Sequence, residues 1–139
     1  MPQKEYRSLD GIHTEPDGTS RIIEVDESQH FTRFRAATLR LYPPETRVAF
    51  PLGVWLSESL TVQKLPGGRF GRRCPPLFPM DGGRHRQRAF RDALADLLPG
   101  CYGFAPTLRL AYFELVPWIW SDDAESRLRE LVESRLTRR

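Results

Sequence analysis

Residues 22–31 have the sequence IIEVDESQHF, an apolar run in which a carboxylate stands at every second position from Glu24. Side chains alternate between the two faces of a β-strand, so Glu24 and Asp26 are expected on one face and Ile23 and Val25 on the other. Two carboxylates at the end of a short buried strand repel each other unless a cation lies between them. Mg²⁺ is the natural candidate because it prefers oxygen ligands.

A further carboxylate lies in the preceding segment. Residues 6–13 are predicted to form another strand, and the turn sequence Pro-Asp-Gly at 16–18 lies between the two strands. A loop over these three residues places Asp10 opposite Glu24, whereas a shift of one residue places Asp10 opposite Val25, on the other face. In the first register the three acids of the hairpin converge on one patch.

This hairpin resembles the PD-(D/E)XK nuclease superfamily, in which an acid on one strand and Glu-x-Lys on the next bind a metal that activates water against a phosphodiester. The closer similarity is to the very-short-patch-repair-like branch, whose second strand has Ile-Glu-x-Asp followed by Gln-His. Here those positions are residues 23–26 and the pair Gln29 and His30. The resemblance covers roughly residues 6–31, and a looser one extends over 84–115.

The resemblance implies a restriction-endonuclease-like fold and a Mg²⁺ or Mn²⁺ ion held by Asp10, Glu24 and Asp26. It also implies that these acids and His30 carry out catalysis. The sequence departs from the pattern at two positions, because Asp26 stands where the superfamily has Lys and Glu27 stands where the branch often has Gly. Asp26 therefore either joins the metal or accepts the proton of the attacking water, and the positive charge of Lys has to come from another residue.

The bulk properties fit one domain over residues 1–139, with a net charge of +3 and a pI of about 9.2. Nineteen of the 21 basic residues are Arg, which reflects either a GC-rich genome or phosphate recognition by bidentate contacts. The two cysteines lack the paired spacing of a zinc site. With no signal peptide or transmembrane stretch in the sequence, we expect a cytoplasmic protein and no membrane partner.

The remaining pattern predicts an α/β (α+β) fold, a small mixed sheet in which the acid-bearing N-terminal hairpin is flanked by helices. Residues 43–83 would be an insertion, in which the stretch after Pro51 is either a helix, as we favour, or an irregular strand. The customary leading helix of the superfamily is missing, so the last helix or a second subunit has to cover one sheet face. We therefore expect a homodimer.

The expected later elements are a helix over 31–42, a helix over 84–98 with Phe90, Ala93, Leu94 and Leu97 inward, a strand over 107–116 and a helix over 121–136.

A Pro/Gly/Arg-rich loop over 66–83 is either a basic clamp for nucleic acid or a disordered insertion. The expected nucleic-acid contacts are Gln29, Arg69, Arg72, Arg73, Arg84, Gln87 and Arg88. We therefore predict a metal-dependent nuclease that hydrolyses phosphodiester bonds, with DNA as the expected substrate. The alternative is a catalytically inactive module of the same fold that binds nucleic acid or a protein through the loop and the turn at Trp118 to Trp120.

Overall fold

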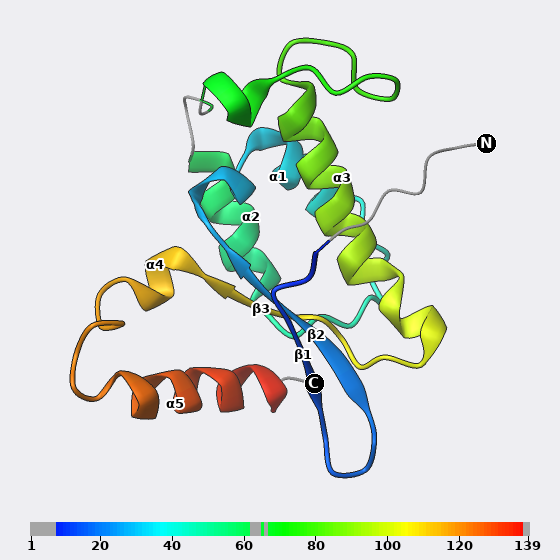
Figure 1. Ribbon diagram of the computed structural model, residues 1–139. Helices are drawn as coiled ribbons and strands as arrows, with labels where there is room; N and C mark the ends of the chain where they lie inside the picture. The colour runs from blue at the N-terminus through cyan, green and yellow to red at the C-terminus, as the bar shows by residue number, and fades with distance from the viewer. Residues whose placement is uncertain (1–7, 62–64, 66, 138–139) are drawn as a thin grey trace.

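The computed structural model describes residues 8–61, 65 and 67–137. Its sheet has three strands in the order β1-β2-β3 (Figure 1). Strand β1 (Gly11–Thr14) is antiparallel to β2 (Ser20–Asp26), and β2 is parallel to β3 (Leu108–Ala111). Helices flank this sheet, so the predicted mixed α/β class with a small mixed sheet is confirmed.

The β1–β2 hairpin turns through a three-residue loop, as the Pro-Asp-Gly sequence predicted. The backbone N–H of Glu15 donates to the carbonyl of Thr19 at 2.8 Å, which leaves residues 16–18 as the loop. Gly18 has a φ of 89°, a left-handed conformation that glycine adopts without a steric penalty. The turn chemistry therefore fixes the register of the hairpin.

The register is the one that brings the two acids together. Gly11 pairs with Ile23, so the next position places Asp10 opposite Glu24. Backbone pairing of β1 ends at Gly11, and there the Asp10 side chain continues it: Oδ2 accepts from the backbone N–H of Val25 at 2.7 Å. The pairing of Asp10 with Glu24 predicted from the sequence is thus confirmed.

Helices cover both faces of the sheet (Figure 1). One face meets α1 (Arg33–Arg40), α2 (Leu52–Thr61) and α3 (Gly83–Leu97). Its apolar core consists of Phe31, Leu39, Phe50, Trp55 and Ala111. The other face meets α5 (Ala124–Leu136), and its core consists of Ala49, Leu108 and Leu110 with Leu128, Leu131, Val132 and Leu136 of α5 packed against it. The sequence analysis expected either the last helix or a second subunit to cover this face, and the structure shows that α5 covers it. The homodimer stays a prediction.

The buried face of α3 differs from the prediction. Phe90 is 47% exposed and Leu97 is 37% exposed, so the expected apolar stripe does not face the core. The buried residues of α3 are instead Gly83, His85, Arg88, Ala89, Asp92, Ala95 and Asp96. The prediction was wrong because the surface opposite this helix carries the buried guanidinium groups of Arg35 and Arg109. These groups pair with acidic side chains of α3 rather than with apolar ones.

The other elements agree with the sequence more closely. Helix α2 confirms the favoured helix near Pro51. Helix α1 begins at Arg33, after an N-cap at Thr32, and the preceding residues form a separate 3-10 turn, η1 (Ser28–His30). Strand β3 ends at Ala111, earlier than predicted. A short helix, α4 (Tyr112–Leu115), follows it. The N-terminus of this helix is capped by a hydrogen bond from the Ala111 N–H to Glu114 Oε2 at 2.9 Å.

The segment between α2 and α3 contains the 3-10 turn η2 (Gly68–Gly71), and a third such turn, η3 (Pro99–Tyr102), follows α3. Pro66, the first residue of the predicted basic loop, lies outside the described residues. Over the described ranges, no helix is both long enough and apolar enough to cross a membrane.

Candidate functional site

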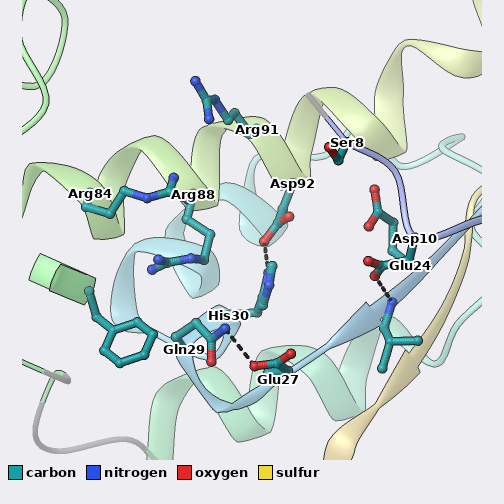
Figure 2. Close-up of a pocket in the computed structure, with 12 residues that line it drawn as sticks. Ser8, Asp10, Glu24, Glu27, Gln29, His30, Arg84, Arg88, Arg91 and Asp92 are labelled. Atoms are coloured by element: carbon teal, nitrogen blue, oxygen red, sulfur yellow. Dashed lines mark hydrogen bonds and ion pairs between the residues drawn. The ribbon is translucent and has the colours of Figure 1, made fainter. Parts of the chain in front are cut away.

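A cavity of about 450 Å³ lies between the end of the hairpin, η1, η2 and α3 (Figure 2). Carboxylates from the hairpin line one side, and three arginines of α3 line the other. The lining residues are Ser8, Asp10, Glu24, Val25, Glu27, Gln29, His30, Phe70, Arg84, Arg88, Arg91 and Asp92. Both signs of charge thus meet around one space that is large enough for a small ligand.

The acidic side contains the two residues that face each other in the hairpin. Asp10 is exposed, and one of its oxygens accepts the hydrogen bond from Val25. Glu24 is only 5% exposed and reaches the same cavity from β2. Carboxylate oxygens at neighbouring positions are the donors that a hard divalent cation prefers, so the residues present fit a Mg²⁺ or Mn²⁺ ion.

The basic side follows from helical spacing. Arg84, Arg88 and Arg91 are separated by four and three residues, which places them along one side of α3. Arg88 is 9% exposed, and within the part of the chain that the structure describes its buried Nη1 has no hydrogen-bond partner. Burial, together with the nearby charge of Arg84, lowers the pKa of Arg88, but a guanidinium stays protonated in proteins. A buried cationic donor left without a partner is costly, so the site suits an anion.

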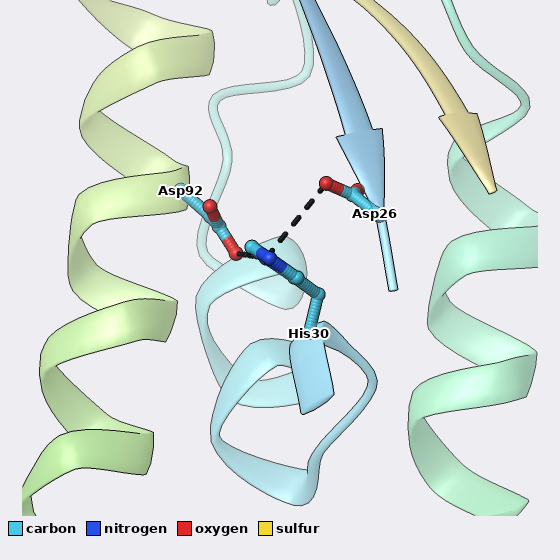
Figure 3. A group of neighbouring side chains, drawn as sticks. All are labelled: Asp26, His30 and Asp92. Atoms are coloured by element: carbon cyan, nitrogen blue, oxygen red, sulfur yellow. Dashed lines mark hydrogen bonds and ion pairs between the residues drawn. The ribbon is translucent and has the colours of Figure 1, made fainter. Parts of the chain in front are cut away.

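His30 lies between two buried carboxylates (Figure 3). Its Nδ1 is 2.8 Å from Asp92 Oδ2 and 3.7 Å from Asp26 Oδ1, and its side chain is 20% exposed. Burial alone would raise the pKa of Asp92, but Arg109 and His30 outweigh burial and hold it below its ordinary value. Asp92 is therefore ionised and accepts the Nδ1 proton, which leaves Nε2 of His30 as the nitrogen able to accept a proton in the neutral ring.

Asp26, His30 and Asp92 have potential ligand atoms within 4.8 Å of one another, which is also a spacing suited to a metal ion. However, Asp26 Oδ1 already accepts from Arg109 Nη1 at 2.7 Å, and Oδ2 accepts from Trp55 Nε1 at 2.7 Å. The guanidinium supplies the positive charge that a cation would supply. We therefore interpret this cluster as part of a buried ion-pair network that orients His30.

The structure brings six of the predicted site residues to the cavity: Asp10, Glu24, Gln29, His30, Arg84 and Arg88. Asp26 belongs to the buried network instead. Arg69 and Arg72 are exposed on the loop, and Arg73 is paired with Asp81 at 2.8 Å. Gln87 accepts a hydrogen bond from Arg84 at 3.0 Å and does not line the cavity.

The sequence prediction missed several lining residues, most importantly Phe70, Arg91 and Asp92. Asp92 had a recognisable signal in the sequence. Arg88, Asp92 and Asp96 follow one another at four-residue spacing, so they share one side of α3, and charges of opposite sign on one side of a helix indicate an ion-pair network. Phe70 had no signal, since its position depends on how the loop packs against α3.

The chain matches no protein-family model, no curated protein and no solved structure. Its function therefore has to be inferred from the geometry and chemistry of this cavity.

Proposed function

We propose that the protein is a metal-dependent nuclease that hydrolyses phosphodiester bonds, with DNA as the expected substrate. One observation carries the proposal: the cavity that contains Asp10 and Glu24 also contains Arg88, whose buried Nη1 has no partner among the described residues. A phosphodiester bound there would present an oxygen to Arg88 and another to a cation on the carboxylates.

The acids have the first role. Asp10 and Glu24 are the residues that would hold Mg²⁺ or Mn²⁺, and the bound ion supplies polarisation of a phosphoryl oxygen and a lower pKa for bound water. Glu24 suits this role because it is held at the centre of the sheet on β2, whereas Asp10 lies at the edge, where solvent and substrate reach it.

The other residues act on the phosphate and the proton. Arg88 binds the phosphate oxygens and stabilises the charge that develops in the transition state, so it supplies the positive charge that Asp26 cannot. His30 accepts the proton of the attacking water at Nε2, because its Nδ1 is directed toward Asp92. Arg84 and Arg91 flank Arg88 and line the same cavity, so we expect them to contact neighbouring phosphates.

Cleavage of labelled single-stranded DNA, double-stranded DNA and RNA with Mg²⁺, Mn²⁺ or EDTA tests the proposal. We expect cleavage that requires the metal and that Glu24→Gln abolishes, while nucleic-acid binding in EDTA is retained or strengthened because a negative charge is removed. Glu125→Gln is a matched control, since Glu125 pairs with Arg129 on the exposed surface of α5 and does not line the cavity. Cleavage by Glu24→Gln at the wild-type rate, or no cleavage of any substrate by the wild type, would refute it.

A second candidate is a nuclease-like module that binds nucleic acid without cleaving it. It is favoured by the state of Asp26, which replaces the usual Lys and has both carboxylate oxygens bonded to Trp55 and Arg109. This candidate predicts binding through Arg88 that is independent of metal, with no cleavage under any of the conditions above.

A further inference from the structure

Phe70 places an exposed aromatic ring in the wall of the cavity. It lies on η2, is 45% exposed, and lines the same space as Arg84 and Arg88. The Arg88 Cζ lies 6.0 Å from the centre of the Phe70 ring. The Arg88 guanidinium therefore lies over the aromatic ring, and its buried Nη1 has no hydrogen-bond partner among the described residues.

The loop that carries Phe70 is attached to the start of α3. The backbone N–H of Gly82 donates to the Gly71 carbonyl at 2.8 Å, and the N–H of Arg84 donates to the Arg72 carbonyl at 2.8 Å. Gly83 is needed for this packing, because a Cβ there would lie 2.1 Å from a backbone oxygen of the loop. Since the same helix carries Arg88, the ring and the guanidinium are held in a fixed relation.

A nucleotide offers both complementary groups, a phosphate for the cation and a base for the ring. Stacking on an aromatic side chain contributes to single-strand binding and tolerates any sequence, because every base has a π-face. We propose that Phe70 is a stacking platform for one unpaired base of a single-stranded nucleic acid whose adjacent phosphate binds Arg88. The inference rests on the proposed function, because it assigns the substrate class of the same cavity.

This geometry selects against an intact duplex. The faces of paired bases are covered by their neighbours in the stack, and exposing one requires unpairing or flipping at a cost of a few kcal/mol. Single strands, frayed ends and unpaired loops already present an open base face, so they are the expected ligands. DNA and RNA share this chemistry.

Binding measured by fluorescence anisotropy in EDTA, where no metal-dependent cleavage occurs, tests the inference. The probes are a single-stranded DNA oligonucleotide, its RNA equivalent, a blunt duplex, and an abasic strand of the same length. Wild-type protein should prefer both single strands to the duplex and to the abasic strand. Phe70→Leu should weaken single-strand binding roughly 5- to 100-fold and leave abasic binding unchanged, whereas Phe70→Tyr should restore tight binding.

Phe90→Leu is the matched control, because Phe90 is 47% exposed and does not line the cavity. The inference is overturned if Phe70→Leu binds single strands as the wild type does, or if it loses abasic and single-strand binding equally. Its failure differs from that of the nuclease proposal. Metal-dependent cleavage with no effect of Phe70 refutes only the stacking platform, and base-dependent binding without cleavage refutes only the nuclease.

Discussion

The guanidinium of Arg109 donates from Nη1 to Asp26 Oδ1 at 2.7 Å, although both side chains are at most 1% exposed. The same guanidinium donates from Nε to Asp96 Oδ1 at 2.7 Å and from Nη2 to the backbone carbonyl of Asp92 at 3.1 Å. Arg109 therefore joins the end of β2 to α3. It fixes the distance across the cavity between the hairpin acids and the α3 arginines.

Asp26→Asn should destabilise the fold by about 3 kcal/mol, because removing one partner of a buried ion pair leaves the other charge without full compensation. Burial alone would lower the pKa of Arg109, but the surrounding carboxylates outweigh burial and keep the pKa raised, so Arg109 stays charged in the variant. Urea unfolding followed by circular dichroism measures the loss.

The control for this prediction is Asp123→Asn, which removes an ion pair with Arg127 on the surface of α5. Its unfolding midpoint should stay at the wild-type value, since exposed pairs contribute little. If Asp26→Asn is as stable as the wild type, the buried network does not hold the two layers together.

Asp92 should make the fold sensitive to acid. Because its pKa in the folded protein lies below the ordinary value, its contribution to stability is complete above about pH 5 and is lost as the pH falls through the folded-state pKa. Asp92→Asn should therefore be less stable near neutral pH. Its free energy of unfolding should also depend less steeply on pH below about pH 4. The reduction in slope should correspond to at most one fewer proton taken up on unfolding. Parallel curves for the two proteins in a pH series of urea titrations would contradict this.

His30→Gln should lower the cleavage rate about 10²- to 10⁴-fold, the usual contribution of a general base, and leave binding in EDTA unchanged. Single-turnover cleavage and anisotropy measure the two quantities separately. His13→Gln is the control, because His13 is exposed on β1 and lies near Glu15 away from the cavity. A parallel loss of binding and cleavage in His30→Gln would assign His30 to substrate binding instead.

The hairpin could be predicted from sequence because its information is local. The turn at Pro16 to Gly18 sets the register, and alternation then places Glu24 and Asp26 on one face. The buried side of α3 could not be predicted in this way. Asp92 and Asp96 can be buried only because two guanidinium groups neutralise their negative charge. These groups belong to Arg109, at least thirteen residues later in the chain, and to Arg35 on another helix. Such pairing depends on tertiary contacts that a periodicity pattern does not contain.

The same limit explains the changed role of Asp26. Its alternation with Glu24 correctly predicted that both side chains are buried on one face, but alternation carries no information about the partner of each carboxylate. Trp55 and Arg109 come from distant segments and occupy Asp26, whereas Glu24 reaches the cavity. Phe70 likewise gains its position from the packing of its loop against α3.

Binding to single-stranded DNA should weaken with salt, and Arg88→Gln should reduce the slope of log K against log salt concentration by roughly 0.7, the value for one phosphate contact on a single strand. The reason is that Arg88 lines the cavity and that its buried Nη1 has no hydrogen-bond partner among the described residues. Anisotropy titrations over a salt series measure the slope.

Arg127→Gln removes the same charge from the surface of α5, where Arg127 pairs with Asp123, and it should leave the slope unchanged. Of the loop arginines, Arg73 is already paired with Asp81, so Arg69 and Arg72 are the better candidates for additional phosphates. Changing both of these to Gln should lower the slope by up to about 1.4 if each binds one phosphate. If Arg88→Gln and Arg127→Gln give parallel salt curves, the cavity does not bind the backbone. The acids of the hairpin would then face a ligand other than a phosphodiester.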